Sequence, residues 1–194
     1  MSTLGRSAGN FVFGATLLAL PVAGCGGNSR AEHKYDLTVP KDWKAWSQPA
    51  PPLVPGKLLE AYEIPTPQGS GSLAVFRSPY LPQTKASELL TQTRYLLLNL
   101  PSLKIDEAKE MEVGGRPAVL VSVTAEGRGL ELAPTGLGKP VLPAGIPGIL
   151  TRRIWVRVPR GPEDGTLEVF FHCPESEYKS FSPVWEKVLA SLRA

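Results

Sequence analysis

The fold of this chain is decided by two segments, Thr151-Arg-Arg-Ile-Trp-Val-Arg-Val158 and Thr166-Leu-Glu-Val-Phe-Phe-His-Cys173. Apolar and polar residues alternate in both, and the Gly-Pro-Glu-Asp-Gly sequence at residues 161–165 between them is typical of a turn. The pattern predicts a β-hairpin. Pairing Val158 with Leu167 makes one face entirely apolar. The other face then consists of three cross-strand pairs, Arg157 with Glu168, Trp155 with Phe170, and Arg153 with His172.

The polar face of this hairpin carries a candidate surface stripe, formed by Arg153, Trp155 and Arg157. Arginine beside an aromatic ring suits the binding of anions or lipid headgroups. The alternative, which we favour, is structural pairing beneath a helix, because each polar residue already has a partner across the hairpin. His172 and Cys173 are neighbours that point to opposite faces of a strand, so they do not form a catalytic dyad.

Helical periodicity indicates two further elements. One helix is expected to start at Lys85 or Ser87 and to end at Asn99, with a buried stripe of Leu89, Leu90, Thr93, Leu96, Leu97 and Leu100. A second helix is expected to start at Ser176 or Glu177. Its buried stripe comprises Phe181, Val184, Trp185, Val188, Leu189 and Leu192. Core packing is the commoner cause of such stripes.

The other predicted elements are strands. We expect them over residues 35–39, 57–64 and 72–76, with Trp43 tucked beneath the domain after a Pro-Lys-Asp-Trp turn. A hairpin is expected over residues 105–113 and 117–125, because two glycines between them suit a tight turn. Its first strand carries four acidic residues that indicate either a cation site or, as we favour, a charged edge strand: Asp106, Glu107, Glu110 and Glu112.

The order of these elements resembles the PsbP-like family. The resemblance rests on Pro40-Lys41-Asp42-Trp43, Gly115-Arg116-Pro117-Ala118 and the aromatic helix over residues 181–192. That family includes a photosystem II extrinsic protein, a Ran-binding protein and many bacterial envelope proteins. The resemblance implies an α+β fold, an antiparallel sheet flanked by helices (an α/β/α sandwich). The chain that follows the signal is too short for two ordinary cores, which predicts a single domain over residues 35–194. A fold with such different partners says little about function.

The N-terminal segment predicts export and lipid attachment. Arg6 and the apolar run over residues 11–20 have the form of a secretory signal, and the run is shorter than the roughly 20 residues of a membrane span. Val22-Ala23-Gly24-Cys25 resembles the bacterial lipobox. This implies cleavage between Gly24 and Cys25, and a diacylglycerol with palmitate chains on Cys25. Secretion without lipid and an uncleaved anchor are the alternatives.

Residues 1–24 would then be a lipoprotein signal peptide, and residues 25–34 are predicted to be a flexible tether that holds the domain close to the membrane. Gly26 follows the cysteine in place of the aspartate that often retains lipoproteins in the inner membrane. If the cell has two membranes, this favours the outer membrane, with the protein facing the periplasm.

Composition excludes two further features. The formal charge of +3 falls to +2 without Arg6, and a net charge this small predicts no nucleic-acid partner. The chain has two cysteines, so acylation of Cys25 leaves Cys173 without an internal disulfide partner.

Residues 127–150 are rich in glycine and proline and predict a long loop, which is often functional when it exceeds about 12 to 15 residues. Its apolar side chains are too numerous for a solvated linker. Six of them form a candidate partner-binding loop: Leu130, Leu132, Leu137, Val141, Leu142 and Ile146.

No catalytic or metal-binding motif is present in the sequence, which contains two histidines and no paired-cysteine spacing. The sequence therefore predicts a non-catalytic, lipid-anchored lipoprotein of the cell envelope, with no cofactor or metal, that binds or organises another envelope protein. The alternative is a small-ligand or metal-ion binding protein, or an enzyme, with a carboxylate-based site assembled from distant acidic residues.

Overall fold

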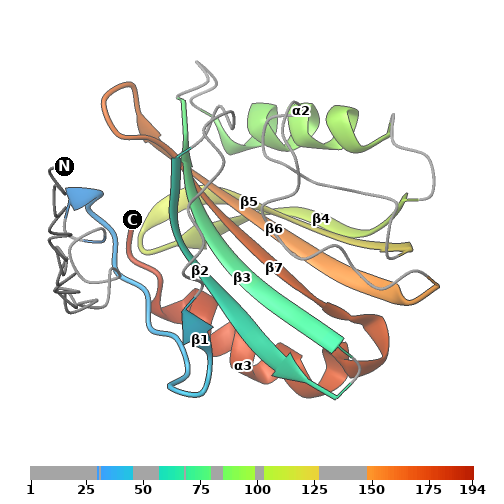
Figure 1. Cartoon of the computed structure of the whole chain (residues 1–194). Helices are drawn as coiled ribbons and strands as arrows, with labels where there is room; N and C mark the ends of the chain where they lie inside the picture. The colour runs from blue at the N-terminus through green and yellow to red at the C-terminus, as the bar shows by residue number, and fades with distance from the viewer. Residues whose placement is uncertain are drawn as a thin grey trace, which may run out of the picture.

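An antiparallel β-sheet with one helix on each face forms the framework of the protein (Figure 1). The computed structural model describes residues 30, 32–45, 57–67, 69–79, 85–98, 103–126 and 148–194. The strands of this part of the chain lie in the order β1-β2-β3-β7-β6-β5-β4. Their bounds are β1 Lys44–Ala45, β2 Lys57–Thr66, β3 Gly69–Ser78, β4 Leu103–Val113, β5 Arg116–Glu126, β6 Leu150–Gly161 and β7 Gly165–Pro174. The helices are α2 Ala86–Leu98 and α3 Tyr178–Ser191, the latter preceded by a 3-10 turn at Glu175–Glu177.

The central hairpin, β6 and β7, has the register that the alternating pattern predicts. Val158 pairs with Leu167, and further along the same ladder the pairs are Arg157 with Glu168, Trp155 with Phe170, and Arg153 with His172. The turn between the strands requires positive φ angles at Gly161 (110°) and Gly165 (71°), which glycine adopts without steric cost. The predicted antiparallel α+β fold is therefore confirmed.

The face of the sheet toward α3 holds the main apolar core. Trp185 of α3 stacks on Phe171 of β7, with ring centroids 5.0 Å apart and planes at 26°. The apolar face of the central hairpin is fully buried beneath this helix, and the thiol of Cys173 belongs to it. Trp43 also joins this core, as predicted.

On the opposite face of the sheet, helix α2 covers strands β4 and β5. Leu89 packs on Val119, and Leu97 packs on Val121 and Val123. Of the other predicted stripe residues of this helix, Thr93 is buried, whereas Leu100 and the side chain of Leu96 lie outside what the structure describes. A separate aromatic cluster of strand residues occupies the β2, β3, β7 and β6 side of the same face: Ala61, Ala74, Phe76, Trp155 and Phe170.

The β4–β5 hairpin forms as expected, with positive φ angles at Gly114 (59°) and Gly115 (81°). Strand β4 is the edge of the sheet and its acidic side chains Glu107, Glu110 and Glu112 are exposed. This confirms the charged edge strand.

The strand predicted over residues 35–39 is wrong. Those residues are extended, but among the described residues Asp36 makes only an isolated bridge to Arg193, with N to O distances of 2.9 and 3.0 Å. The short strand β1 pairs with Tyr62 and Glu63 of β2 instead. Strand β2 continues through Pro65. Proline has no N–H to donate, but among the described residues no strand pairs with β2 on the other side of Pro65, so no hydrogen bond is lost there.

None of the described helices has the length and apolar character needed to cross a membrane.

Candidate functional site

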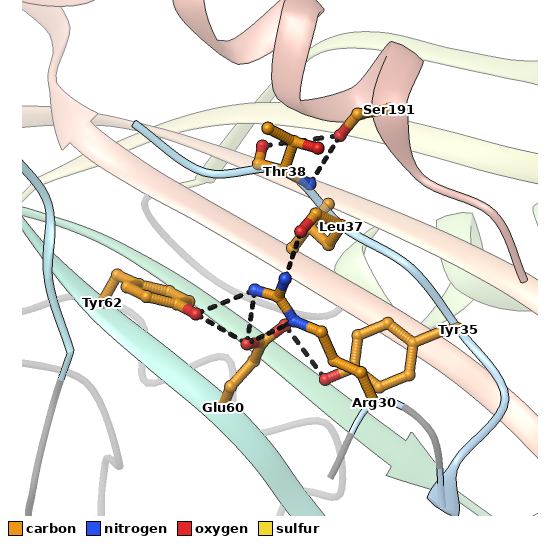
Figure 2. A network of polar contacts seen from close by, with 7 residues as sticks. All are labelled: Arg30, Tyr35, Leu37, Thr38, Glu60, Tyr62 and Ser191. Carbon is orange, nitrogen blue, oxygen red and sulfur yellow. Dashed lines mark hydrogen bonds and ion pairs between the residues drawn. The ribbon is translucent and has the colours of Figure 1, made fainter. Parts of the chain in front are cut away.

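A polar network fastens the segment around residues 30–38 to the sheet (Figure 2). Arg30 donates from Nε and Nη2 to the Glu60 carboxylate at 2.9 to 3.2 Å, and from Nη2 to the Tyr62 hydroxyl at 2.9 Å. The hydroxyls of Tyr35 and Tyr62 donate to the same carboxylate at 3.0 and 2.7 Å. Arg30 also donates to the Leu37 carbonyl. We call these five residues the Arg30–Glu60 network.

A β-bulge gives Glu60 its position. The β2–β3 register shifts between Leu58 and Glu60, so that Glu60 pairs with Val75 and lies on the α3 face of the sheet. The carboxylate is 8% exposed there, and its charge is matched by Arg30 and two hydroxyl donors. Burial, followed by the hydrogen bond to Glu60, raises the pKa of Tyr62 to about 12, so this hydroxyl stays a donor at neutral pH.

The same segment is held at its other end by the end of α3. The Thr38 amide donates to the Ser191 hydroxyl at 2.8 Å, as Figure 2 shows, and Asp36 forms its bridge to Arg193. His33 is 5% exposed, and its carbonyl accepts a hydrogen bond from Arg160 at 2.6 Å. Part of the predicted tether over residues 25–34 thus lies against the sheet: the Glu60 carboxylate binds Arg30, and Arg160 binds the carbonyl of His33.

The candidate surface stripe of Arg153, Trp155 and Arg157 is wrong for two of its members. Trp155 and Arg157 are 5% and 3% exposed. Arg157 donates to the Thr93 hydroxyl of α2 at 3.0 Å and lies 3.4 Å from the Glu168 carboxylate. For Arg157, these contacts fit the alternative, structural pairing beneath a helix.

Glu168 is the acceptor at the centre of this buried group. The indole of Trp155 donates to its carboxylate at 3.0 Å, and the Ser78 hydroxyl donates to its other oxygen. The Arg157 guanidinium carbon also lies 4.8 Å from the Trp155 ring centroid. Burial raises the pKa of the Glu168 carboxyl, whereas Arg157 and the two hydrogen-bond donors oppose that shift. Each carboxylate oxygen of Glu168 thus accepts a hydrogen bond from a neighbouring side chain, whereas the buried Nε of Arg157 has no partner among the described residues.

Arg153, the third stripe residue, differs from Arg157. It is half-buried, and its guanidinium Nε donates to the Thr151 hydroxyl at 3.3 Å. Its neighbour on β7 is His172, which is 7% exposed and in turn pairs with Ser72 of β3. Burial, and then the charge of Arg153, lower the pKa of His172 to about 4. His172 is therefore neutral at pH 7.

A pocket of about 520 Å³, lined by residues of β4, β5 and β6 and by Glu175, is relevant to the alternative function, a ligand or metal site built from carboxylates. Arg152 occupies it, with Asp106 at 3.1 Å and a bidentate pair to Glu175 at 2.5 and 2.7 Å. Each of these two carboxylates is thus already bound to a cation. In the described ranges, no group of three or more His, Cys, Asp or Glu side chains is arranged to hold a metal ion.

The remaining predicted site residues cannot be placed. Gly24 and Cys25 lie outside the described residues. The apolar positions of the predicted partner-binding loop, Leu130, Leu132, Leu137, Val141, Leu142 and Ile146, also lie outside them. Leu150, which ends the predicted loop, instead begins β6 and is 50% exposed.

Sequence reasoning missed the Arg30–Glu60 network. A lone glutamate in the apolar run Leu58-Leu59-Glu60-Ala61-Tyr62 is the one local sign that a buried acidic residue needs a cation. Nothing in the sequence identifies that cation as Arg30, which lies 30 residues earlier.

Comparison with known proteins supports the fold and not a particular activity. No protein-family model matches the sequence, and no curated protein sequence matches it. Among solved structures, LpqN of Mycobacterium tuberculosis, which is involved in cell envelope biogenesis, is similar with a TM-score of 0.55 at 13% identity, covering 82% of each chain. A protein of unknown function from Pseudomonas aeruginosa is similar with a TM-score of 0.52 at 15% identity, covering 82% of this chain and 90% of that one.

The cyanobacterial PsbP of Synechocystis sp. PCC 6803 is similar with a TM-score of 0.51 at 11% identity, covering 90% of this chain and 99% of that one. At such identities the likeness concerns the fold alone. The fold of this chain is PsbP-like, and it occurs both in a protein involved in cell envelope biogenesis and in a cyanobacterial PsbP.

Proposed function

We propose that this protein is a lipid-anchored, non-catalytic component of the bacterial cell envelope that binds or organises another envelope protein. The observation that carries the proposal is the Arg30–Glu60 network. It joins the folded sheet to the chain five residues after Cys25, the residue that the lipobox pattern marks for acylation. A fully extended chain of five residues spans at most about 18 Å. A lipid on Cys25 would therefore keep the sheet next to the headgroups.

The location of the protein is supported by two independent features. The secretory signal and lipobox pattern at residues 1–25 are those of an exported lipoprotein. LpqN, which has a similar fold, takes part in cell envelope biogenesis. The carboxylate-based alternative has less support at the pocket beside Arg152, because Asp106 and Glu175 both pair with that arginine.

Lipid attachment is tested by metabolic labelling with an alkyne fatty acid, followed by membrane fractionation. The native chain should carry the label and sediment with membranes, whereas Cys25→Ser should carry no label and be released. Cys173→Ser is the matched control and should behave as the native chain, because that thiol is fully buried. An unlabelled native chain would refute the anchor.

The binding role is tested by crosslinking in cells and affinity capture with the lipidated chain. A variant in which residues 127–147 are replaced by a short glycine-serine turn should lose the captured envelope protein. A second variant, with serine at the six apolar loop positions, keeps the loop length and should lose it as well. Failure of the native chain to capture any envelope protein would refute the binding role and leave the lipid anchor standing.

A further inference from the structure

Three polar side chains form one row across the middle of the sheet, on the face that α2 partly covers. Ser72 of β3 pairs with His172 of β7, and His172 pairs with Arg153 of β6. Residues directly opposite each other in antiparallel strands have Cβ atoms about 4.5 to 5.5 Å apart. The hydroxyl, the imidazole and the guanidinium are therefore close neighbours.

The polar atoms of this row lack partners. Within the described ranges, neither ring nitrogen of His172 has a hydrogen-bond partner, nor does the Ser72 hydroxyl, although all three atoms are buried. Native proteins rarely leave such groups unpaired, because each costs about 1 to 3 kcal/mol. Unpaired buried atoms on two adjacent strands point to a ligand that satisfies them together.

Arg153 supplies the charge of the row. Among the described residues it makes one hydrogen bond, from Nε to the Thr151 hydroxyl, and none of them binds its two terminal nitrogens. Arg152 and Arg157, on the same strand, each have a carboxylate partner, but no ion pair in the described chain includes Arg153. The planar fork of a guanidinium suits bidentate binding of an oxyanion, and that of Arg153 is half-buried and has no carboxylate partner among the described residues.

We propose that Arg153, His172 and Ser72 form a binding site for a small oxyanion, a phosphate or carboxylate group. The Arg153 guanidinium binds two of its oxygens. Neutral His172 donates one N–H and the Ser72 hydroxyl donates another hydrogen bond. The adjacent row is the stacked pair of Trp155 and Phe170, with ring centroids 5.1 Å apart. This apolar neighbour excludes water and so strengthens the charge interaction.

The site stands independently of lipid attachment. The chain has two histidines, so a protein labelled only at histidine gives separate imidazole NMR signals for His33 and His172. With the Cys25→Ser mature chain at neutral pH, titration of inorganic phosphate or acetate should move the His172 signals along a saturating curve.

Arg153→Gln should weaken this response by at least about tenfold, which corresponds to the loss of one charged hydrogen bond. Arg153→Lys keeps the charge without the planar fork and should give an intermediate response, and Ser72→Ala should weaken binding less. These two variants keep the test available if Arg153→Gln does not fold. Lys57→Gln is the matched control: it removes the ammonium 3.0 Å from His33 Nε2 and should leave the His172 response unchanged.

Short-chain phosphatidylglycerol distinguishes the source of the oxyanion. Movement of the His172 signals by phosphate alone identifies a soluble ligand, whereas movement by the lipid alone identifies a headgroup. Signals that stay fixed with every probe, or that move equally in Arg153→Gln, would overturn the proposal.

Discussion

Replacement of Arg30 by glutamine tests whether the segment after Cys25 is part of the folded domain. The substitution removes the guanidinium that donates to Glu60 at 2.9 to 3.2 Å and leaves a carboxylate that is 8% exposed without a cation. Breaking a fully buried ion pair costs about 3 to 5 kcal/mol, and an exposed pair about 0 to 1 kcal/mol. The two side chains here are 23% and 5% exposed, so the geometry lies nearer the buried case.

We therefore expect Arg30→Gln to lower the free energy of unfolding by about 2 to 3 kcal/mol. The measurement is urea unfolding of the mature Cys25→Ser chain, monitored by tryptophan fluorescence. A double-mutant cycle with Glu60→Gln should give a coupling of at least about 1.5 kcal/mol, because the two groups are in direct contact.

The matched control is Lys34→Gln in the same segment. Lys34 lies 3.2 Å from Asp164, but the two side chains are 69% and 33% exposed, so its loss should cost less than about 1 kcal/mol. Equal small losses in the Arg30 and Lys34 variants, with no coupling to Glu60, would show that the segment does not dock on β2. The argument for a sheet held close to the membrane would then fail.

Four further outcomes follow from the buried groups. Trp185→Ala should cost about 3 to 5 kcal/mol in urea melts and Trp185→Phe clearly less, because the ring is 2% exposed and stacked; a loss below about 1 kcal/mol would show that α3 is not docked. Arg157→Met should lower the free energy of unfolding by about 3 to 5 kcal/mol, and adding Glu168→Met should restore much of that stability, since the second change removes the unpaired carboxylate. Strictly additive losses in the two single variants and the double variant would contradict this pairing. Burial, and then Glu175 and Glu177, raise the pKa of Cys173 to about 12, so this thiol should resist a maleimide at pH 8 in the folded state and react fully in urea. His172 has a pKa of about 4 in the folded state and near 6.5 in the unfolded state, so the unfolded state binds the proton first as the pH drops. The free energy of unfolding should therefore fall by about 3 kcal/mol in total between these two pH values. His172→Gln should lose that part of the pH dependence, and an unchanged profile would contradict the burial of this ring.

The sheet was largely predictable from the sequence, and the reason lies in short-range pairing. Strands β6 and β7 are joined by a turn of a few residues, so the alternation in each strand and the requirement for one apolar face leave a single register. The described members of the two helix stripes, such as Leu89, Leu97 and Trp185, pack on the sheet as predicted, since a period of three to four residues is a local property.

The burial and the charge partners of the three candidate stripe residues could not be predicted from the hairpin alone. Arg153, Trp155 and Arg157 alternate identically along β6. Arg157 is buried because Thr93 of α2 lies above it, 64 positions away in the chain. Arg153 lies four residues before Arg157 on the same strand, where no described carboxylate forms an ion pair with it. Their different environments follow from where the helix crosses the sheet.

The sequence by itself determined strands β2 to β7, the helices α2 and α3, the central register and the expectation of a lipid on Cys25, because each depends on residues close together in the chain. The tertiary structure alone decided that Arg30 belongs to the domain, since any of 18 acidic residues offered it a partner and only the bulge at Glu60 buries one beside it. It also decided that Arg153, unlike Arg152 and Arg157, has no carboxylate partner among the described residues. Charge pairing between distant segments depends on burial, and burial is a property of the assembled fold.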